Sequence, residues 1–230
     1  MQLFISDAYD LNQNNIIIYD ERIVHQCFHV LRYKPNQSLQ LQDKWMRYTL
    51  CIRNISKKEI ITDITNTETS LPYDSKTTLS IALPNRFDKA ELIVQKLTEI
   101  GIDHINFWKA ERSILRDIPD KKLQRLQSIA IEAAEQSFRR SLPTIAYLDN
   151  SIENHILESE HTIFFNRWWG KNIWWGHTTS IHALIGPEWW FSPTEIERFK
   201  QKNIAVYSLW DTILRMETAA IIWSRLIKNL

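Results

Sequence analysis

Two turns of this 230-residue chain carry polar side chains that could act on a bound ligand, those of Glu188 and Arg215. Glu188 follows the apolar, strand-like run 180–185, and Arg215 lies between the run 204–209 and the last helix. In α/β proteins a ligand binds outside the carboxyl ends of the strands, where turn backbone and helix amides can face it. We therefore expect a ligand to bind beside these two turns.

A third candidate is Arg139, near the carboxyl end of a long helix predicted over 119–140. It lies three residues after Gln136, so the two side chains share one face of that helix. A guanidinium can hold a phosphate or a carboxylate through two parallel hydrogen bonds. By charge alone, Arg139 fits equally well as a surface arginine near a helix carboxyl end.

The elements that position these residues predict a parallel sheet with helices. Residues 79–83 read as a buried strand, and 88–100 as a helix that ends at Gly101 before a further strand. Such a strand-helix-strand unit places its two strands in parallel. Ser192, with Glu195 three residues later, predicts a capping box at the start of a helix.

Residues 1–70 have a different pattern, in which short alternating apolar runs are interrupted by one helix over 21–32. Alternation with a period of two is typical of strands that bury one face, so this region predicts a small β-barrel with a helix across its mouth. Residues 66–75 are rich in Thr, Ser, Glu and Asp and contain a proline, and they are the predicted linker to the rest of the chain.

Composition excludes several classes of protein. The formal net charge is +1, so any affinity for nucleic acid must come from a local patch. The two cysteines form no CxxC pair and the histidines share no metal-ligand spacing with acidic or thiol residues, so we predict no metal site. There is no apolar signal core after Met1, and no run approaches the roughly 18 apolar residues of a membrane span. We expect a cytoplasmic protein with no membrane segment.

Three motifs point to a known family. Residues 185–192 read Ile-Gly-Pro-Glu-x-x-Phe-Ser, 209–219 read Leu-x-Asp-Thr-Ile-Leu-Arg-Met-Glu-Thr-Ala, and 132–139 read Glu-Ala-x-Glu-Gln-Ser-x-Arg. Together they resemble the signature of the RsmE-type ribosomal RNA uridine-N3 methyltransferases, a branch of the SPOUT superfamily.

The resemblance implies an α/β fold with a SPOUT-type parallel sheet and a carboxyl-terminal trefoil knot over residues 75–230, preceded by a PUA-like RNA-binding β-barrel over residues 1–70. It implies S-adenosylmethionine-dependent methylation of N3 of a uridine in the 16S rRNA of the small ribosomal subunit. It also implies a homodimer. Knots are nearly absent from proteins, so the family likeness alone supports this one.

The resemblance also assigns roles to residues. Arg139 would steady the uracil anion or an adjacent phosphate, and Glu188 and Arg215 would lie near the methyl group or the base. The motifs identify no general base, and Glu188 is named as a candidate for that role. The expected cofactor-binding residues, which act largely through backbone groups, are Leu184, Ile185, Gly186, Trp189, Trp190, Leu209, Trp210, Ile213 and Leu214.

Basic residues cluster in the first region, where the family has its RNA-binding domain. The candidates for phosphate contacts are Arg22, His25, Arg32 and Lys34, with His29 close by. A solvated helix end, whose cations merely offset the helix dipole, explains the same residues equally well.

Tryptophan stands at family glycine positions in both carboxyl-terminal motifs, at Trp189, Trp190 and Trp210. Ten Trp against four Gly inverts normal usage, because average chains carry roughly 7% Gly. We hypothesise that most of these tryptophans are glycines in an organism that reads UGA as glycine, with Trp108 as a genuine exception. Glycine would let the backbone approach the cofactor closely, whereas an indole would fill that space.

Two other functions remain open. One is a SPOUT methyltransferase that acts on a different RNA. The other is a non-catalytic RNA-binding module in which genuine tryptophans block the cofactor pocket and stack on bases.

Overall fold

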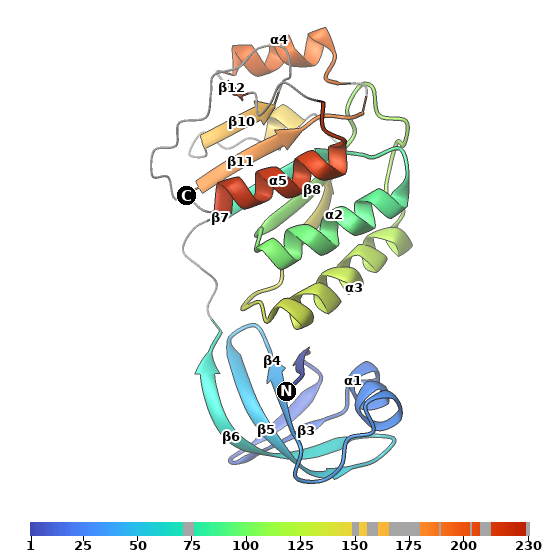
Figure 1. Cartoon of the computed structure of the whole chain (residues 1–230), viewed down its shortest axis with the longest axis vertical. Helices are drawn as coiled ribbons and strands as arrows, with labels where there is room; N and C mark the ends of the chain where they lie inside the picture. The colour runs from blue at the N-terminus through green and yellow to red at the C-terminus, as the bar shows by residue number, and fades with distance from the viewer. Residues whose placement is uncertain are drawn as a thin grey trace. The chain divides into compact units, whose positions relative to one another are not determined.

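The computed structural model describes residues 1–70, 76–148, 152–155, 161–165, 180–188, 190–202, 204–207 and 213–228. The chain divides into two compact units. The first consists of Met1–Pro72 and Ala134–Ser141, and the second of Tyr73–Ala133 and Leu142–Leu230. Each unit holds one sheet (Figure 1).

The first unit contains a six-stranded sheet in the order β1-β4-β5-β6-β3-β2. Its strands are β1 (Leu3–Ile5), β2 (Tyr9–Asn12), β3 (Asn15–Ile18), β4 (Ser38–Gln42), β5 (Met46–Ile55) and β6 (Ile60–Thr69). Neighbouring strands are antiparallel, except that β1 and β4 are parallel. Because side chains alternate along a strand, residues such as Leu39, Leu41 and Leu50 face one buried core.

The helix predicted over 21–32 is present as α1 (Glu21–His25), which continues into a single π-helical segment, η1 (Gln26–Val30). Asp20 caps its amino end, because the carboxylate accepts hydrogen bonds from the amides of Arg22 and Ile23. Ile23 and Cys27 pack into the core of the sheet.

The predicted linker is wrong in its first half. Residues 66–69 belong to strand β6, and their registered partners on β5 run from Thr49 to Met46. The threonine-rich composition there marks an exposed strand, since β-branched Thr suits the pleated backbone as well as a loop. Strand β2 had no predicted counterpart, because its four residues are mostly exposed and bury no apolar face.

The second unit contains a six-stranded, all-parallel sheet in the order β12-β10-β11-β7-β8-β9. Its strands are β7 (Lys76–Ala82), β8 (His104–Trp108), β9 (Thr144–Leu148), β10 (His161–Phe165), β11 (Ser180–Ile185) and β12 (Ala205–Tyr207). Its helical segments are α2 (Phe87–Ile100), α3 (Asp120–Ser137), the 3-10 segment η2 (Ile152–His155), α4 (Pro193–Gln201) and α5 (Met216–Lys228), except that the last turn of α3, from Ala134 on, belongs to the first unit. The expected α/β architecture and its parallel sheet are confirmed.

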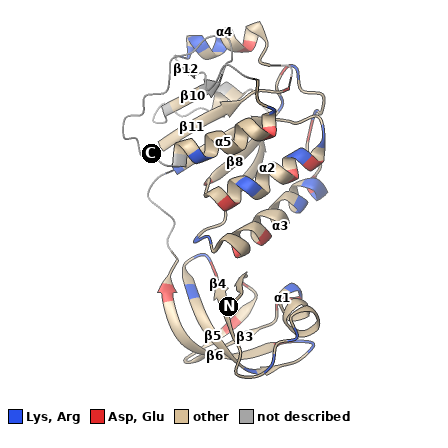
Figure 2. Cartoon of the chain, in the orientation of Figure 1, with Lys and Arg blue, Asp and Glu red and all other residues tan. Residues whose placement is uncertain are grey.

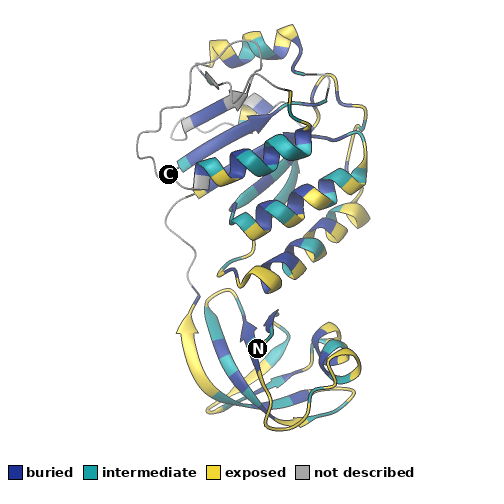
Figure 3. Cartoon of the chain, in the orientation of Figure 1, coloured by how far each residue is buried: buried dark blue, intermediate teal, exposed yellow. Residues whose placement is uncertain are grey.

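The two faces of this sheet are covered differently (Figures 1 and 3). Alternate residues such as Ile81 and Ala183 pack in one cluster with buried residues of α2, α3 and α5. Ala82 and Leu184, which point the other way, pack with Phe199 of α4. The period-two alternation of the strands therefore builds a core on each side of the sheet.

The predicted helix boundaries depend on local capping. Gly101 ends α2 in the left-handed conformation, with φ 106°. Ser192 caps α4 in the predicted capping box, where its hydroxyl accepts from the amide of Glu195 and the Glu195 carboxylate accepts from the amide of Ser192.

The described helices are all too short or too polar to cross a membrane. Lysines and arginines alternate with acidic residues along α2 and α3 (Figure 2).

Candidate active site at the switch point of the parallel sheet

The order of the strands brings two loops together. Strand β7 lies between β8 and β11, so the chain leaves β7 towards one side of the sheet and later returns to its other side. The carboxyl end of β7 and that of β11 are in register, with Ile81 beside Ile185. Such a switch point is where open α/β sheets bind ligands. The turn that carries Glu188 therefore lies where a ligand site is expected.

Glu188 connects this turn to two other elements. Its Oε1 accepts a hydrogen bond from the backbone amide of Asn85, in the loop after β7, at 3.1 Å. The same oxygen lies 2.9 Å from Nζ of Lys89 on α2. Lys89 also lies 3.9 Å from Oε2 of Glu217, in the first turn of α5. One ammonium group thus stands between two carboxylates and links the turn to α2 and α5.

The surroundings of Glu188 lower the pKa of its carboxyl. Partial burial on its own would raise the pKa, but the hydrogen bonds from Lys89 and from the amide of Asn85, with the charge of Lys89, outweigh it. The group is therefore ionised near neutrality. A general base works best when its pKa lies near the working pH, so this environment favours a positioning role for Glu188.

The backbone of the turn has the geometry that glycine favours. The amide of Trp190 donates to the carbonyl of Pro187 at 2.9 Å, and Trp190 has φ 65°. An L side chain is disfavoured in this left-handed conformation. A Cβ atom on Gly186 would lie 3.0 Å from the ring of Phe191, so that position also has little room for a side chain. The described part of the turn fits a cofactor bound through close backbone approach.

The remaining candidate cofactor residues divide into three groups. Leu184 and Ile185 are buried at the end of β11. Ile213 is 57% exposed and Leu214 is half-buried, just before α5. Trp189, Leu209 and Trp210 lie outside the described residues. Arg215 is exposed, and its carbonyl accepts from the amide of Ala219 in the first turn of α5.

Arg139 lies in the first unit, with the last turn of α3. Its side chain is buried, with 9% exposure, and its amide donates to the carbonyl of Ala134 at 3.0 Å. The structure therefore groups Glu188 and Arg215 in one unit and Arg139 in the other.

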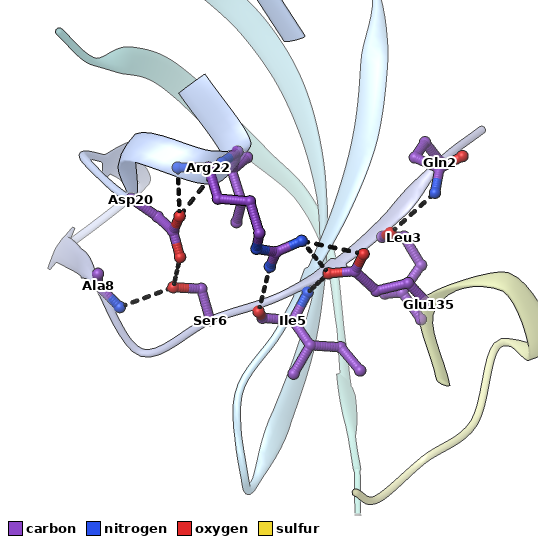
Figure 4. Close-up of polar contacts among 9 residues, drawn as sticks. Gln2, Leu3, Ile5, Ser6, Ala8, Asp20, Arg22 and Glu135 are labelled. Carbon is purple, nitrogen blue, oxygen red and sulfur yellow. Dashed lines mark hydrogen bonds and ion pairs between the residues drawn. The ribbon is translucent and has the colours of Figure 1, made fainter. Parts of the chain in front are cut away.

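The four RNA-binding candidates also lie in the first unit, and they differ in environment. All four are exposed. The guanidinium of Arg22, however, lies 2.9 Å from the buried carboxylate of Glu135 and donates to the carbonyl of Ile5 at 2.9 Å (Figure 4). This contact gives Arg22 a structural partner.

The tryptophans outside the turn after β11 bear differently on the hypothesis that tryptophan replaces glycine. Trp45 is 56% exposed in the β4–β5 turn. Its φ is not positive, so its backbone does not require glycine. Trp223 is 1% exposed and packs in the main core within helix α5, where glycine would leave a cavity. Trp108 is buried at the end of β8. The paired tryptophans between residues 168 and 175 lie outside the described residues.

The sequence motifs do not predict a role for Lys89. Its signal is weak, because one lysine in the first turn of a helix is common on protein surfaces. The order of the strands, which places α2 beside the turn after β11, is what gives it a role.

Comparison with known proteins identifies the family. A family described as RNA methyltransferase domain matches residues 71–228. A ribosomal RNA small subunit methyltransferase E 2 from Borreliella burgdorferi is 27% identical, over 96% of this chain and 94% of its own length. A ribosomal RNA small subunit methyltransferase E from Mesomycoplasma hyopneumoniae is 30% identical, over 74% of this chain and 75% of its own length.

A similar solved structure is that of a ribosomal RNA small subunit methyltransferase E from Neisseria gonorrhoeae bound to S-adenosylmethionine. It has a TM-score of 0.84 at 22% identity and covers 100% of this chain and 97% of its own, which shows a shared fold. The chain belongs to the RNA methyltransferase domain family, in its RsmE-type branch. The resemblance drawn from the motifs is confirmed.

Proposed function

We propose that this protein transfers a methyl group from S-adenosylmethionine to N3 of a uridine in the 16S rRNA of the small ribosomal subunit. The observation that carries the proposal is the turn Gly186–Trp190, which lies at the switch point of a parallel sheet within the family match. The names of the relatives supply the substrate class, and the solved homologue supplies the cofactor.

S-adenosylmethionine, when bound, supplies a methyl group that its sulfonium already activates. Backbone groups of Leu184, Ile185 and Gly186, at the end of β11, are proposed to hold it. Trp189, Trp190, Leu209, Trp210, Ile213 and Leu214 complete the proposed set. Glu188 fixes the turn through Lys89 and Asn85, and the exposed Arg215 is proposed to meet the substrate.

Uridine N3 carries a proton and is a poor nucleophile until that proton leaves. The protein must therefore hold the uracil in place and favour its anion. Arg139 is proposed to stabilise that anion or an adjacent phosphate, because a guanidinium binds anions through paired hydrogen bonds. We assign no residue as the general base.

We propose the trefoil knot that the family resemblance implies. Strand β12 lies at the edge of the sheet, whereas α5, which follows it in the sequence, packs against β7 and β11 in the middle. This placement of the last helix over the middle of the sheet supports the proposal.

Residues 1–70 are proposed to form the PUA-like RNA-binding barrel, and residues 75–230 the methyltransferase domain. The exposed His25, Arg32 and Lys34 are the proposed phosphate contacts of the barrel, with a secondary contribution from Arg22. We also propose a homodimer that works in the cytoplasm.

The test uses the full chain in two forms, as written and as a glycine form in which Trp189, Trp190 and Trp210 are replaced by Gly. Each form is incubated with labelled S-adenosylmethionine and one RNA substrate. Three substrates are tested in separate reactions: naked 16S rRNA, small ribosomal subunits and transfer RNA. Product positions are mapped by reverse transcription, which stops at N3-methyluridine because its pairing edge is blocked.

We expect the glycine form to modify one uridine of the small-subunit RNA. Modification of transfer RNA alone would favour a SPOUT enzyme with another substrate. RNA binding without transfer by either form would contradict the proposal and favour a non-catalytic RNA-binding module.

A further inference from the structure

Helix α3 is followed by Phe138, whose left-handed backbone conformation is disfavoured for phenylalanine. Phe138 has φ 53°, and the amide of Arg139 donates to the carbonyl of Ala134 at 3.0 Å. This hydrogen bond belongs to the Schellman ending of a helix, in which the left-handed residue is usually glycine. A phenylalanine there is strained. Such strain persists only where the surroundings enforce it, and it concentrates at functional sites.

Three side chains of the first unit hold the backbone of this turn in its conformation. Nε2 of Gln42, which is 1% exposed, donates to the carbonyls of Arg139 and Arg140 at 3.2 and 2.9 Å. Arg47 donates to Oε1 of Gln42 and to the carbonyls of Phe138 and Arg139. The buried hydroxyl of Ser70 donates to the carbonyl of Arg140. Three consecutive carbonyls are thus held in place.

A second contact fixes the same helix end one turn earlier. Oε1 of Glu135 accepts from the amide of Ile5 at 2.9 Å, and Arg22 bonds both Glu135 and the carbonyl of Ile5 (Figure 4). Asp20 in turn accepts from the hydroxyl of Ser6 and caps α1, which carries Arg22. Both polar groups of the strand residue Ile5 are therefore paired with side chains at the edge of the sheet.

This fixed turn presents an aromatic ring and positive charge. Phe138 is 46% exposed, and Arg140 beside it is exposed. Arg139 adds a positive charge in the same turn, and the guanidinium of Arg47 on β5 contacts its carbonyls. The nearest acidic residue before the turn in the sequence, Glu135, is paired with Arg22. Rigid aromatic rings flanked by arginines are what proteins use to stack unpaired bases and hold the adjoining phosphates.

We propose that the turn 138–140 is an RNA-binding element, in which Phe138 stacks on an unpaired base of the ribosomal RNA and Arg140 binds a neighbouring phosphate. The proposal rests on the proposed function for the identity of the RNA. Gln42, Arg47 and Ser70 are its positioning residues, because they contact the backbone of the turn.

The decisive variant is Phe138→Gly, which relieves the strain and removes the ring. We expect its melting temperature to equal or exceed that of the unchanged protein, since glycine suits the left-handed position. We expect its affinity for a labelled single-stranded oligonucleotide of small-subunit rRNA sequence to fall by about fivefold or more, as the loss of one stacked base predicts. Phe138→Trp should keep the affinity. Leu11→Ala, which truncates another exposed apolar side chain of the first unit, should leave it unchanged.

Arg140→Gln provides a second readout. Removing one phosphate contact should weaken binding about equally for all sequences and reduce the salt dependence by about one charge. Binding by Phe138→Gly at the affinity of the unchanged protein would overturn the proposal. So would a change in oligomeric state alone, which would place the ring between two copies of the chain.

Binding is measured without S-adenosylmethionine, so the result is independent of methyl transfer. Binding that depends on Phe138 without methyl transfer would sink the proposed function and leave the RNA-binding turn standing. If the glycine form transfers methyl groups and Phe138→Gly leaves its KM for RNA unchanged, the proposed function stands and the RNA-binding turn is contradicted.

Discussion

Two aromatic residues in the described part of the chain hold a left-handed backbone, for different reasons. Trp190 has φ 65° in the turn after β11, and Phe138 has φ 53° at the end of α3. Glycine is favoured at both places. A UGA codon read as glycine would explain a tryptophan in the sequence, but it cannot explain a phenylalanine. The conformation of Trp190 is therefore consistent with an unseen glycine, whereas the strain at Phe138 belongs to the protein itself.

The two turns also differ in how they are held. Glu188 is tied to Asn85 and Lys89 by contacts that follow from the order of the parallel strands. The turn at Phe138 is held by the side chains of Gln42 and Arg47. In both turns the partners lie more than ninety residues away in the sequence. The difference is that the order of the parallel strands predicts where the first turn lies, whereas no motif predicts the side chains that hold the second.

The largest effect is expected from Lys89→Met, which removes the cation that holds the turn after β11. Glu188 and Glu217 would lose the cation between them, and an uncompensated, partly buried carboxylate is costly. We expect a loss of about 3 kcal/mol in the free energy of unfolding, measured in urea. Lys96→Met on the same helix removes only an exposed pair and should cost less than about 1 kcal/mol. Equal losses would show that Lys89 has no special role.

Glu135→Ala breaks the second turn. It leaves the amide of Ile5 without its acceptor and Arg22 without its carboxylate. We expect a loss of about 2 kcal/mol in the free energy of unfolding, together with weaker RNA binding through the displaced turn. Glu132→Ala, at an exposed site on the same helix, should change stability by less than about 0.5 kcal/mol. A Glu135→Ala protein as stable as this control would contradict the clamp.

A smaller effect is expected where the first turn leads into α4. Ser192→Ala removes the hydroxyl that accepts from the amide of Glu195 and should cost about 1 kcal/mol. Ser192→Asn, which can still cap the helix, should restore most of that loss in thermal unfolding. Failure of Asn to restore it would mean that the hydroxyl acts through buried packing instead of capping.

The smallest expected effect is a difference between Glu188 and Glu135 in how their contributions to stability depend on pH. The pKa of Glu188 is lowered in the folded state, so its contribution to stability is present above pH 4.5 and is lost as the pH falls through the folded value. Burial raises the pKa of Glu135, and the amide of Ile5 and the charge of Arg22 offset this only in part. Its contribution is therefore greatest at low pH and declines as the pH rises through the folded pKa.

Unfolding measured from pH 3 to 7 should show these opposite signs. The destabilisation caused by Glu188→Gln should shrink towards acid pH, and that caused by Glu135→Gln should grow. The same slope for both variants would contradict the difference between the two environments.

The sequence predicts much of the second unit because its patterns are local. Strand alternation, Gly101 at the end of α2 and the capping box at Ser192 all depend on neighbouring residues, and each is present in the structure. Strand β9 (Thr144–Leu148) had no predicted counterpart, because its residues are half-buried at the sheet edge and carry a weak pattern.

The contacts that build the sites could be predicted less well. The motif places Glu188 in a turn, but only the neighbouring loop reveals that its carboxylate holds Lys89. The sequence predicts Arg22 as a phosphate ligand because it shares a helix with other cations, but its partner Glu135 is 113 residues away. Hydrogen bonds between such distant residues leave no periodic signal in a single sequence.

The most direct test of the proposed active site is a calorimetric titration of S-adenosylmethionine into two full-length proteins, the chain as written and the glycine form. We expect the glycine form to bind the cofactor and the written form to give no heat of binding, because indoles replace the glycines of the turn. Binding by the written form alone, or by neither form, would contradict the placement of the cofactor at this turn.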